Sequence, residues 1–232
     1  WTEKTKTVTA NISTDSAEVL IYVKGTIGDH IEIDSIAVVS TTLASTSIYD
    51  IQYSTIIGGA SPLTGQTVET GGVVTAVTTD TSGYFIQNGS GPWSGIYVFD
   101  QQNIPEIGDS ILFSAQVNEF YDFTELENPV NYTIVSSGNN VWIDEIDASM
   151  ANSEEYEGCL VKLNNVECTG LPNNYDEWMA NDNSEDIMIS PLLYFYNPIV
   201  SNTYDITGVI EYSFGEFKLC PRSSSDVVGS GS

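Results

Sequence analysis

The sequence is short of positively charged residues. Only 6 of its 232 residues are Lys or Arg, against 32 Asp or Glu, so the formal net charge is −26 at pH 7. None of the six lies between Lys24 and Lys162. A surface with this balance repels phosphate backbones, anionic lipids and anionic polysaccharides. We therefore expect any ligand other than a metal ion to be neutral or cationic; the alternative is that the charge serves solubility alone.

Histidine is also scarce, which weighs against catalysis. The single histidine is His30, in an expected turn. Ser-His-Asp and Cys-His arrangements both need a histidine base, and no nucleophile motif of the G-x-S-x-G type is present. Glycosidases use a pair of carboxylates, but acidic residues are so abundant here that finding such a pair in the sequence is no evidence for that activity. We expect a protein that is not an enzyme, with any catalytic domain lying outside this sequence.

Long apolar runs are absent and cysteines are few. No stretch of about 18 apolar residues occurs, so we expect no membrane insertion. The cysteines Cys159, Cys168 and Cys220 form no C-x-x-C motif, which argues against zinc and thioredoxin-type chemistry. Cys159 alternates with Val161 and Leu163, a pattern typical of a buried thiol. Among the bridges that these cysteines allow we expect Cys168 to Cys220, which would need an oxidising compartment.

What the sequence does have is a β-rich composition. Hydrophobic residues make up 41% and charged residues 16%, and many of the others are Thr, Ser, Asn and Gly. This predicts short strands separated by loops around apolar cores. We expect strands within residues 1–39 and at 131–135, and a single short helix over residues 146–156.

Two segments of the chain form an internal repeat, each with about five expected strands. The offset between equivalent positions is 87 at the first strand (Gly71 to Gly158) and 93 afterwards (Phe85 to Trp178), which places one insertion in the first loop of the second copy. Five short strands separated by turns are typical of the oligonucleotide- and oligosaccharide-binding (OB) barrel. The predicted fold is all-β, with tandem OB-like five-stranded barrels and an N-terminal β-sandwich-like strand segment. The predicted parts are 1–47 (N-terminal strands), 48–130 (first barrel), 131–155 (connector), 156–228 (second barrel) and 229–232 (linker or tag).

Several short motifs follow one another in a recognisable order. They include Ser61-Pro62-Leu63-Thr64-Gly65, Gly83-Tyr84-Phe85-Ile86-Gln87, Ile107-Gly108-Asp109, Tyr156-Glu157-Gly158 and Leu219-Cys220-Pro221-Arg222. Over residues 48–226 this order resembles the OB-fold region of secreted bacterial endonuclease/exonuclease/phosphatase-family nucleases, and similar modules occur in Bacteroidetes surface proteins. Upstream, Val23-Lys24-Gly25 and Ile33 to Val38 resemble the last strands of secreted jelly-roll modules, which bind carbohydrate or serve in adhesion.

The resemblance implies an extracellular or cell-surface accessory module for binding, adhesion or spacing. It is non-catalytic, because the nuclease chemistry of that family lies in a separate domain. The implied partner is a glycan or a protein at the cell surface. One alternative is a nucleic-acid-binding module of a secreted nuclease, which the lack of Lys and Arg disfavours. The other is a structural subunit of an extracellular assembly that self-associates through strands at its ends.

The expected ligand-binding residues are aromatic. Tyr84, Trp93, Tyr97 and Trp178 could stack on sugars or bases if they are exposed, and core packing is the alternative. Trp93 is the strongest of the four, because it lies in a Gly- and Ser-rich loop between the second and third strands of the first copy. That loop adjoins the face that OB folds use for ligands.

A second expected site is a loop rich in oxygen ligands. Asp182, Ser184 and Asp186 alternate in the second copy, and a hard cation such as calcium binds through six to eight oxygens. The glycine and the distal glutamate of a calcium-binding loop are missing, so solvated acidic side chains are the alternative. We expect no required cofactor, with calcium as the candidate ion for this loop.

Overall fold

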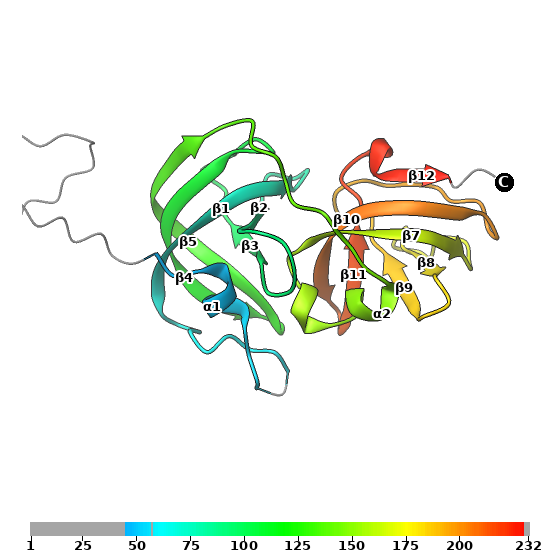
Figure 1. Ribbon diagram of the computed structural model, residues 1–232, viewed down its shortest axis with the longest axis horizontal. Helices are drawn as coiled ribbons and strands as arrows, with labels where there is room; N and C mark the ends of the chain where they lie inside the picture. The colour runs from blue at the N-terminus through cyan, green and yellow to red at the C-terminus, as the bar shows by residue number, and fades with distance from the viewer. Residues whose placement is uncertain (1–44, 57, 230–232) are drawn as a thin grey trace, which may run out of the picture. The chain divides into compact units, whose positions relative to one another are not determined.

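The computed structural model describes residues 45–56 and 58–229. The strands expected within residues 1–39, the histidine His30 and the jelly-roll resemblance lie outside the described residues. Within them the chain is nearly all β, with twelve strands and four short helical segments (Figure 1). None of the helices in this part has the length and hydropathy needed to cross a bilayer.

The first β unit is a closed five-stranded barrel. Helix α1 (Ile48–Gln52) precedes it, capped by the Ser47 side chain, which accepts a hydrogen bond from the Asp50 N–H. The strand order is β1-β2-β3-β5-β4, antiparallel except for the β3–β5 pair. The strands are β1 (Thr67–Val77), β2 (Gly83–Gln87), β3 (Gly95–Phe99), β4 (Ser110–Phe120) and β5 (Phe123–Ser136).

The second unit is a seven-stranded sheet with the order β12-β10-β11-β9-β8-β7-β6. Because β10 also pairs with β7, the strands β7 to β11 close on themselves. The strands are β6 (Asp144–Glu145), β7 (Leu160–Cys168), β8 (Trp178–Asn181), β9 (Asp186–Ile189), β10 (Thr203–Ser213), β11 (Glu216–Cys220) and β12 (Val227–Gly229), and the helical segments are α2 (Ala148–Ala151), η1 (Glu154–Tyr156) and η2 (Ser224–Asp226).

The two closed units share one topology. Strands β7 to β11 repeat the neighbours of β1 to β5, and the parallel β3–β5 pair has its counterpart in the parallel β9–β11 pair. The predicted internal repeat of two OB-like barrels is therefore confirmed as a repeat of strand order.

The register of the repeat differs from the predicted one at two points. Thr67 on β1 lies opposite Gln116 on β4, and Leu160 on β7 lies opposite Val209 on β10. Equivalent positions of β1 and β7 are therefore also 93 residues apart. Gly158 precedes β7 and is not the equivalent of Gly71. In the second strands, Tyr84 lies opposite Val98 and Trp178 lies opposite Ile189. Trp178 therefore corresponds to Tyr84, not to Phe85, because side chains alternate between the two faces of a strand.

The segment between the barrels contains less independent structure than expected. Residues 131–135, expected as a separate strand, are the continuation of β5, which runs to Ser136, past the boundary placed at residue 130. The helix expected over residues 146–156 forms as two short segments, α2 and η1. Asp147 begins α2, because its carboxylate accepts a hydrogen bond from the Met150 N–H.

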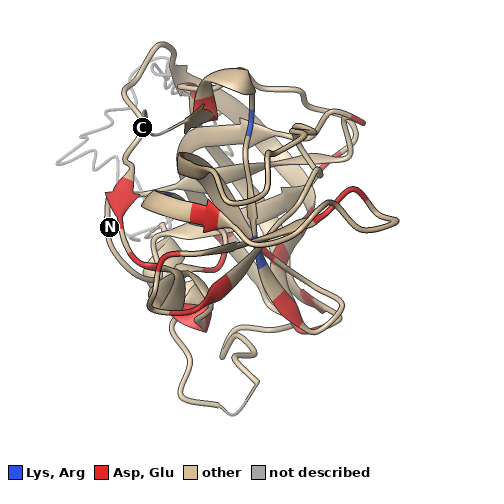
Figure 2. Cartoon of the chain, turned by 90° about the vertical axis from the view of Figure 1, so that its right-hand side faces the viewer, with Lys and Arg blue, Asp and Glu red and all other residues tan. Residues whose placement is uncertain are grey.

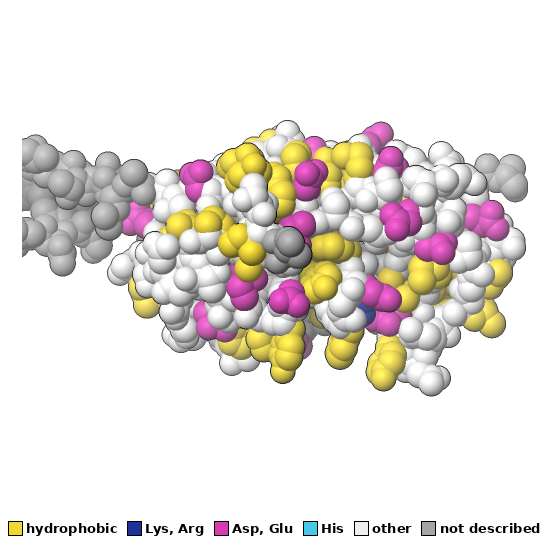
Figure 3. Space-filling view, turned by 90° about the horizontal axis from the view of Figure 1, so that it is seen from below, with side chains coloured by type: hydrophobic (Ala, Val, Ile, Leu, Met, Phe, Trp, Pro, Cys, Tyr) yellow, Lys and Arg dark blue, Asp and Glu magenta, His cyan; other side chains and the backbone are white. Residues whose placement is uncertain are grey.

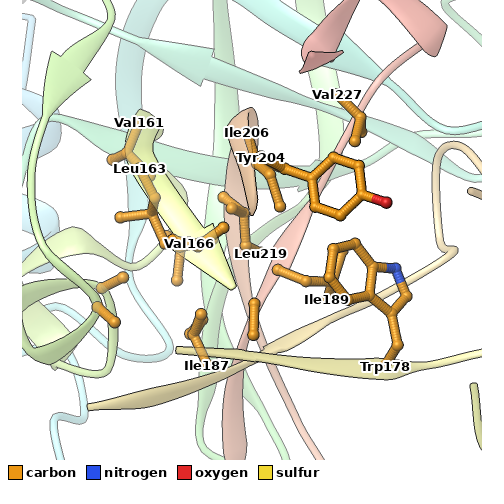
Figure 4. Close-up of a cluster of buried hydrophobic side chains, with 14 of the residues drawn as sticks. Val161, Leu163, Val166, Trp178, Ile187, Ile189, Tyr204, Ile206, Leu219 and Val227 are labelled. Carbon is orange, nitrogen blue, oxygen red and sulfur yellow. The ribbon is translucent and has the colours of Figure 1, made fainter. Parts of the chain in front are cut away.

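Each barrel closes around its own apolar interior. In the second, strands on all sides direct side chains inward, with Trp178 and Tyr204 edge to face at 5.8 Å between ring centroids (Figure 4). Trp178 is only 2% exposed. In the first, Ile111, Phe113, Ala115 and Val117 alternate inward along β4, as their spacing predicts.

We predict that Trp178→Ala lowers the free energy of unfolding by about 3–5 kcal/mol, because it removes a large ring from a closed core. The control is Tyr175→Ala, since Tyr175 is 78% exposed and should change stability by less than about 0.5 kcal/mol. Urea denaturation followed by fluorescence measures both. Equal losses in the two variants would contradict this account of the core.

Candidate functional site

The second barrel covers the outer face of β2 and β3. Phe85 and Tyr97 point away from the first barrel's interior and pack in a buried cluster with Leu160, Val209 and Cys220 of the second barrel. This is the face that OB folds use for ligands. In the first barrel it is therefore occupied by protein, and we call this contact the joint.

Buried hydrogen bonds cross the joint as well. The Leu160 N–H donates to Gln87 Oε1 at 2.9 Å, and the Thr124 N–H donates to Glu157 Oε1 at 3.0 Å. Gly95 shows how close the backbones come, because a Cβ added there would lie 2.3 Å from the Gly158 carbonyl oxygen. Contacts of this density are typical of a protein interior rather than of two domains on a flexible tether.

The loop that carries Trp93 is part of the joint. The Gly91 N–H donates to Asp144 Oδ2 at 2.6 Å, and the Trp93 N–H donates to the Glu155 carbonyl oxygen at 2.6 Å. Trp93 has a φ of 63°, a left-handed backbone conformation that these contacts stabilise. Trp93 is buried, with 9% of the residue exposed, and its ring packs edge to face on Tyr53 beside a surface hollow that it lines.

The other three aromatic residues expected to bind ligand are buried as well. Tyr84 lies inside the first barrel and donates from its hydroxyl to Asp100 Oδ2 at 3.1 Å, and Trp178 lies inside the second. Tyr97 lies in the joint. The structure thus corrects the expectation of an exposed aromatic platform at these positions: strand alternation directs two of the rings inward, and the second barrel covers the third.

The acidic loop between β8 and β9 is held by internal hydrogen bonds. Asp182 Oδ2 accepts from the Ala148 N–H at 2.7 Å, and its other oxygen accepts from Ser184 Oγ at 2.6 Å. Burial raises the pKa of Asp182, but these hydrogen bonds outweigh it and hold the pKa below its ordinary value. Asp186 accepts from Asn181. Among residues 45–56 and 58–229, no three Asp, Glu, His or Cys side chains are arranged to hold one metal ion, and calcium binding here stays a prediction.

The predicted disulfide does not form. All three cysteines lie in the described part of the chain, and each is a free, buried thiol. Cys168 belongs to the core of the second barrel, whereas Cys220 points out of that core into the joint. Both cysteines lie near strand ends in the sequence, but one side chain faces the core of the second barrel and the other faces the joint.

Carboxyl groups from both barrels gather at the joint, and no Lys or Arg of the described residues forms an ion pair with them. Glu157 is 1% exposed and its Oε2 has no hydrogen-bond partner, as is also true of Glu119 Oε2. Burial, followed by repulsion from Glu154 and Glu119, raises the pKa of Glu157 well above its ordinary value. Burial, with repulsion from Glu119 and Asp122, raises the pKa of Glu154 to about 7. Folding therefore shifts Glu154 and Glu157 toward their protonated forms.

Two hollows of about 490 Å³ each lie beside the joint. They share Tyr212 and Phe217, whose rings lie 4.8 Å apart, and we call the two adjoining hollows together the groove. The surface seen from below carries apolar side chains interrupted by Asp and Glu (Figure 3). The first hollow is lined by Trp93, Asp122, Glu154 and Glu155 among others, and the second by Met179, Met188, Glu185, Asp186 and Glu216 among others.

Every basic side chain in the described residues already has an acidic partner. Lys218 binds Glu177 at 2.6 Å, Arg222 binds Asp226 at 2.9 Å, and Lys162 lies 3.8 Å from Asp205. Acidic residues, in contrast, are spread over strands and loops (Figure 2). No patch in this part of the protein offers unpaired cations to a polyanion, so none of these surfaces favours binding of nucleic acid.

We predict that the protein loses stability as the pH rises from 5 to 8. A carboxyl group whose pKa is raised by folding contributes stability that is complete below its unfolded pKa and is lost as the pH rises through its folded pKa. Glu154 and Glu157 both have raised pKa values, so the loss extends through about pH 7. Thermal unfolding across this pH range measures it.

Glu157→Gln should flatten this profile and stabilise the protein at pH 8 by roughly 1–3 kcal/mol, because the amide keeps the acceptor for the Thr124 N–H without a buried charge. Glu106→Gln is the control, because Glu106 is exposed and the substitution removes one carboxyl group, as Glu157→Gln does. If both variants shift the profile alike, general repulsion at the surface causes the pH dependence and the joint does not.

No protein-family model matches this chain, and no curated protein is significantly similar to it. The family behind the sequence resemblance therefore has no support beyond the OB-like topology. The function has to be inferred from the joint, the groove and the distribution of charge.

Proposed function

We propose that this chain is a non-catalytic accessory module of an extracellular or cell-surface protein, in which two barrels act as one rigid spacer that carries a binding groove. The observation that carries the proposal is the joint. It removes the ligand face of the first barrel from solvent and fixes the second barrel in place. A rigid pair presents one groove in a defined orientation, which suits adhesion and spacing.

The chemistry of the described residues supports a non-catalytic role. The cysteines are poor nucleophiles, because burial raises the pKa of Cys159 to about 11 and that of Cys220 well above its ordinary value. A thiol reacts as its thiolate, and a raised pKa keeps the thiol protonated at neutral pH. The sequence has one histidine, His30, so a histidine base would have to come from outside the barrels.

The same joint weighs against an assembly built by repeating it. The second barrel contributes Leu160 and Val209, and the equivalent positions of the first barrel are Thr67 and Gln116. The outer face of the first barrel therefore lacks the apolar side chains needed to receive a third barrel in the same way. The joint is specific to one pair of barrels, which favours a spacer over a polymerising subunit.

We predict that the protein in its native cells is cleaved by an externally added protease without lysis. Proteinase K shaving of intact cells, followed by detection with an antibody against residues 45–229, measures this, and a cytoplasmic protein serves as the control for lysis. Protection in intact cells with cleavage only after lysis would contradict the proposed location.

We also predict no binding of labelled single-stranded DNA at tens of micromolar protein at low salt with EDTA, because the described basic side chains are all paired. Fluorescence anisotropy measures this, with a known single-strand-binding protein as the positive control. Saturable binding would instead favour the role of a nuclease accessory.

A further inference from the structure

We propose that the groove beside the joint binds a basic segment of a protein partner, an extended stretch that carries Lys or Arg next to apolar side chains. The proposal rests on the function proposed above and names the partner. Its basis is the match between the lining of the groove and the chemistry of such a segment.

The groove has an apolar floor and an acidic rim. Trp93, Tyr212 and Phe217 form the aromatic part of the floor, and Met179 and Met188 extend it across β8 and β9. Asp122, Glu154 and Glu155 lie at one end, and Glu185, Asp186 and Glu216 lie at the other. Within the described part of the chain, no Lys or Arg lines either hollow. Apart from Glu154, whose raised pKa favours its neutral form, the groove presents exposed carboxylates beside aromatic side chains, the pairing that Lys and Arg side chains prefer.

The second barrel's part of the groove is the face that the joint closes in the first barrel. Phe85 lies opposite Tyr97 on β2 and β3, and Met179 lies opposite Met188 at the equivalent positions of β8 and β9. In the first copy this face packs against another protein surface. In the second it is partly exposed, and its flexible methionine side chains can adapt to the apolar groups of a partner.

A second copy of the barrels is a poor occupant. The basic residues of the described part, Lys162, Lys218 and Arg222, are already paired with carboxylates. Another copy would bring further acidic residues against an acidic rim, and like charges repel. The described residues therefore offer the groove no unpaired cation, which favours a segment of a different protein as its occupant.

The test is a titration of the full chain at about 150 mM salt with fluorescein-labelled decapeptides. One peptide alternates Lys with Leu, a second alternates Lys with Ser, and a third alternates Glu with Leu. We expect saturable binding of the first, weaker binding of the second because it lacks apolar groups, and none of the third. Absence of saturable binding by the Lys-Leu peptide would overturn the proposal.

Two double variants locate the site. Glu155→Gln with Glu216→Gln removes two exposed rim charges, and Glu106→Gln with Glu167→Gln removes two exposed charges outside the groove lining. The rim variant should weaken binding about fivefold to tenfold, and the control variant less than about twofold. Equal weakening would show attraction by the acidic surface as a whole and would overturn the proposal. Because the titration uses purified chain, its failure is distinct from a failure of the surface-shaving experiment.

Discussion

The rest of the structure depends on burial of the outer face of β2 and β3 beneath the second barrel. Phe85 and Tyr97 would otherwise leave two large rings in water on a face that OB folds keep open for ligands. Covering them fixes Leu160, Val209 and Cys220 as the opposing surface. It also fixes the loop of Trp93, whose backbone donates to η1 of the second unit. The groove exists because this packing brings Trp93 beside Tyr212 and Phe217.

The joint forms against the electrostatics of the chain. A protein with a net charge of −26 repels itself, and Glu119, Glu154 and Glu157 add carboxyl groups at the contact. Neutral donors compensate part of this cost: the Thr124 N–H for Glu157, and the Ser61 N–H and Thr124 hydroxyl for Glu119. The raised pKa values of Glu154 and Glu157 favour their protonated forms, and an uncharged carboxyl group loses far less on burial. Apolar packing thus fixes the joint, and its carboxyl groups make it sensitive to pH.

Local patterns predicted the elements of the fold, but not how the barrels meet. Alternation along Ile111 to Val117 and the recurring turns were enough for two OB-like barrels, because strand faces and turn residues are local properties. Two predictions were wrong: the disulfide between Cys168 and Cys220 and the exposed aromatic platform at Tyr97. Both depend on which strand face the other barrel covers, and a local pattern does not show that. The Gly-rich loop pointed to Trp93, which lies at the joint with a left-handed backbone, and ligand binding by its ring stays a prediction. Glu157 entered the sequence analysis only as part of the Tyr156-Glu157-Gly158 motif, and its burial could not be predicted among so many acidic residues.

The two copies show how one face can serve two purposes. Both barrels have the same strand order, so the outer faces of β2–β3 and β8–β9 are equivalent positions. The first carries aromatic rings, which gain most from a fixed, tightly packed contact. The second carries methionines, which have more rotatable bonds and tolerate different neighbours. A rigid contact needs a single shape, whereas a groove for an incoming segment benefits from side chains that can rearrange. The exchange of Phe85 and Tyr97 for Met179 and Met188 is therefore what one expects if the first face joins the barrels and the second receives the partner.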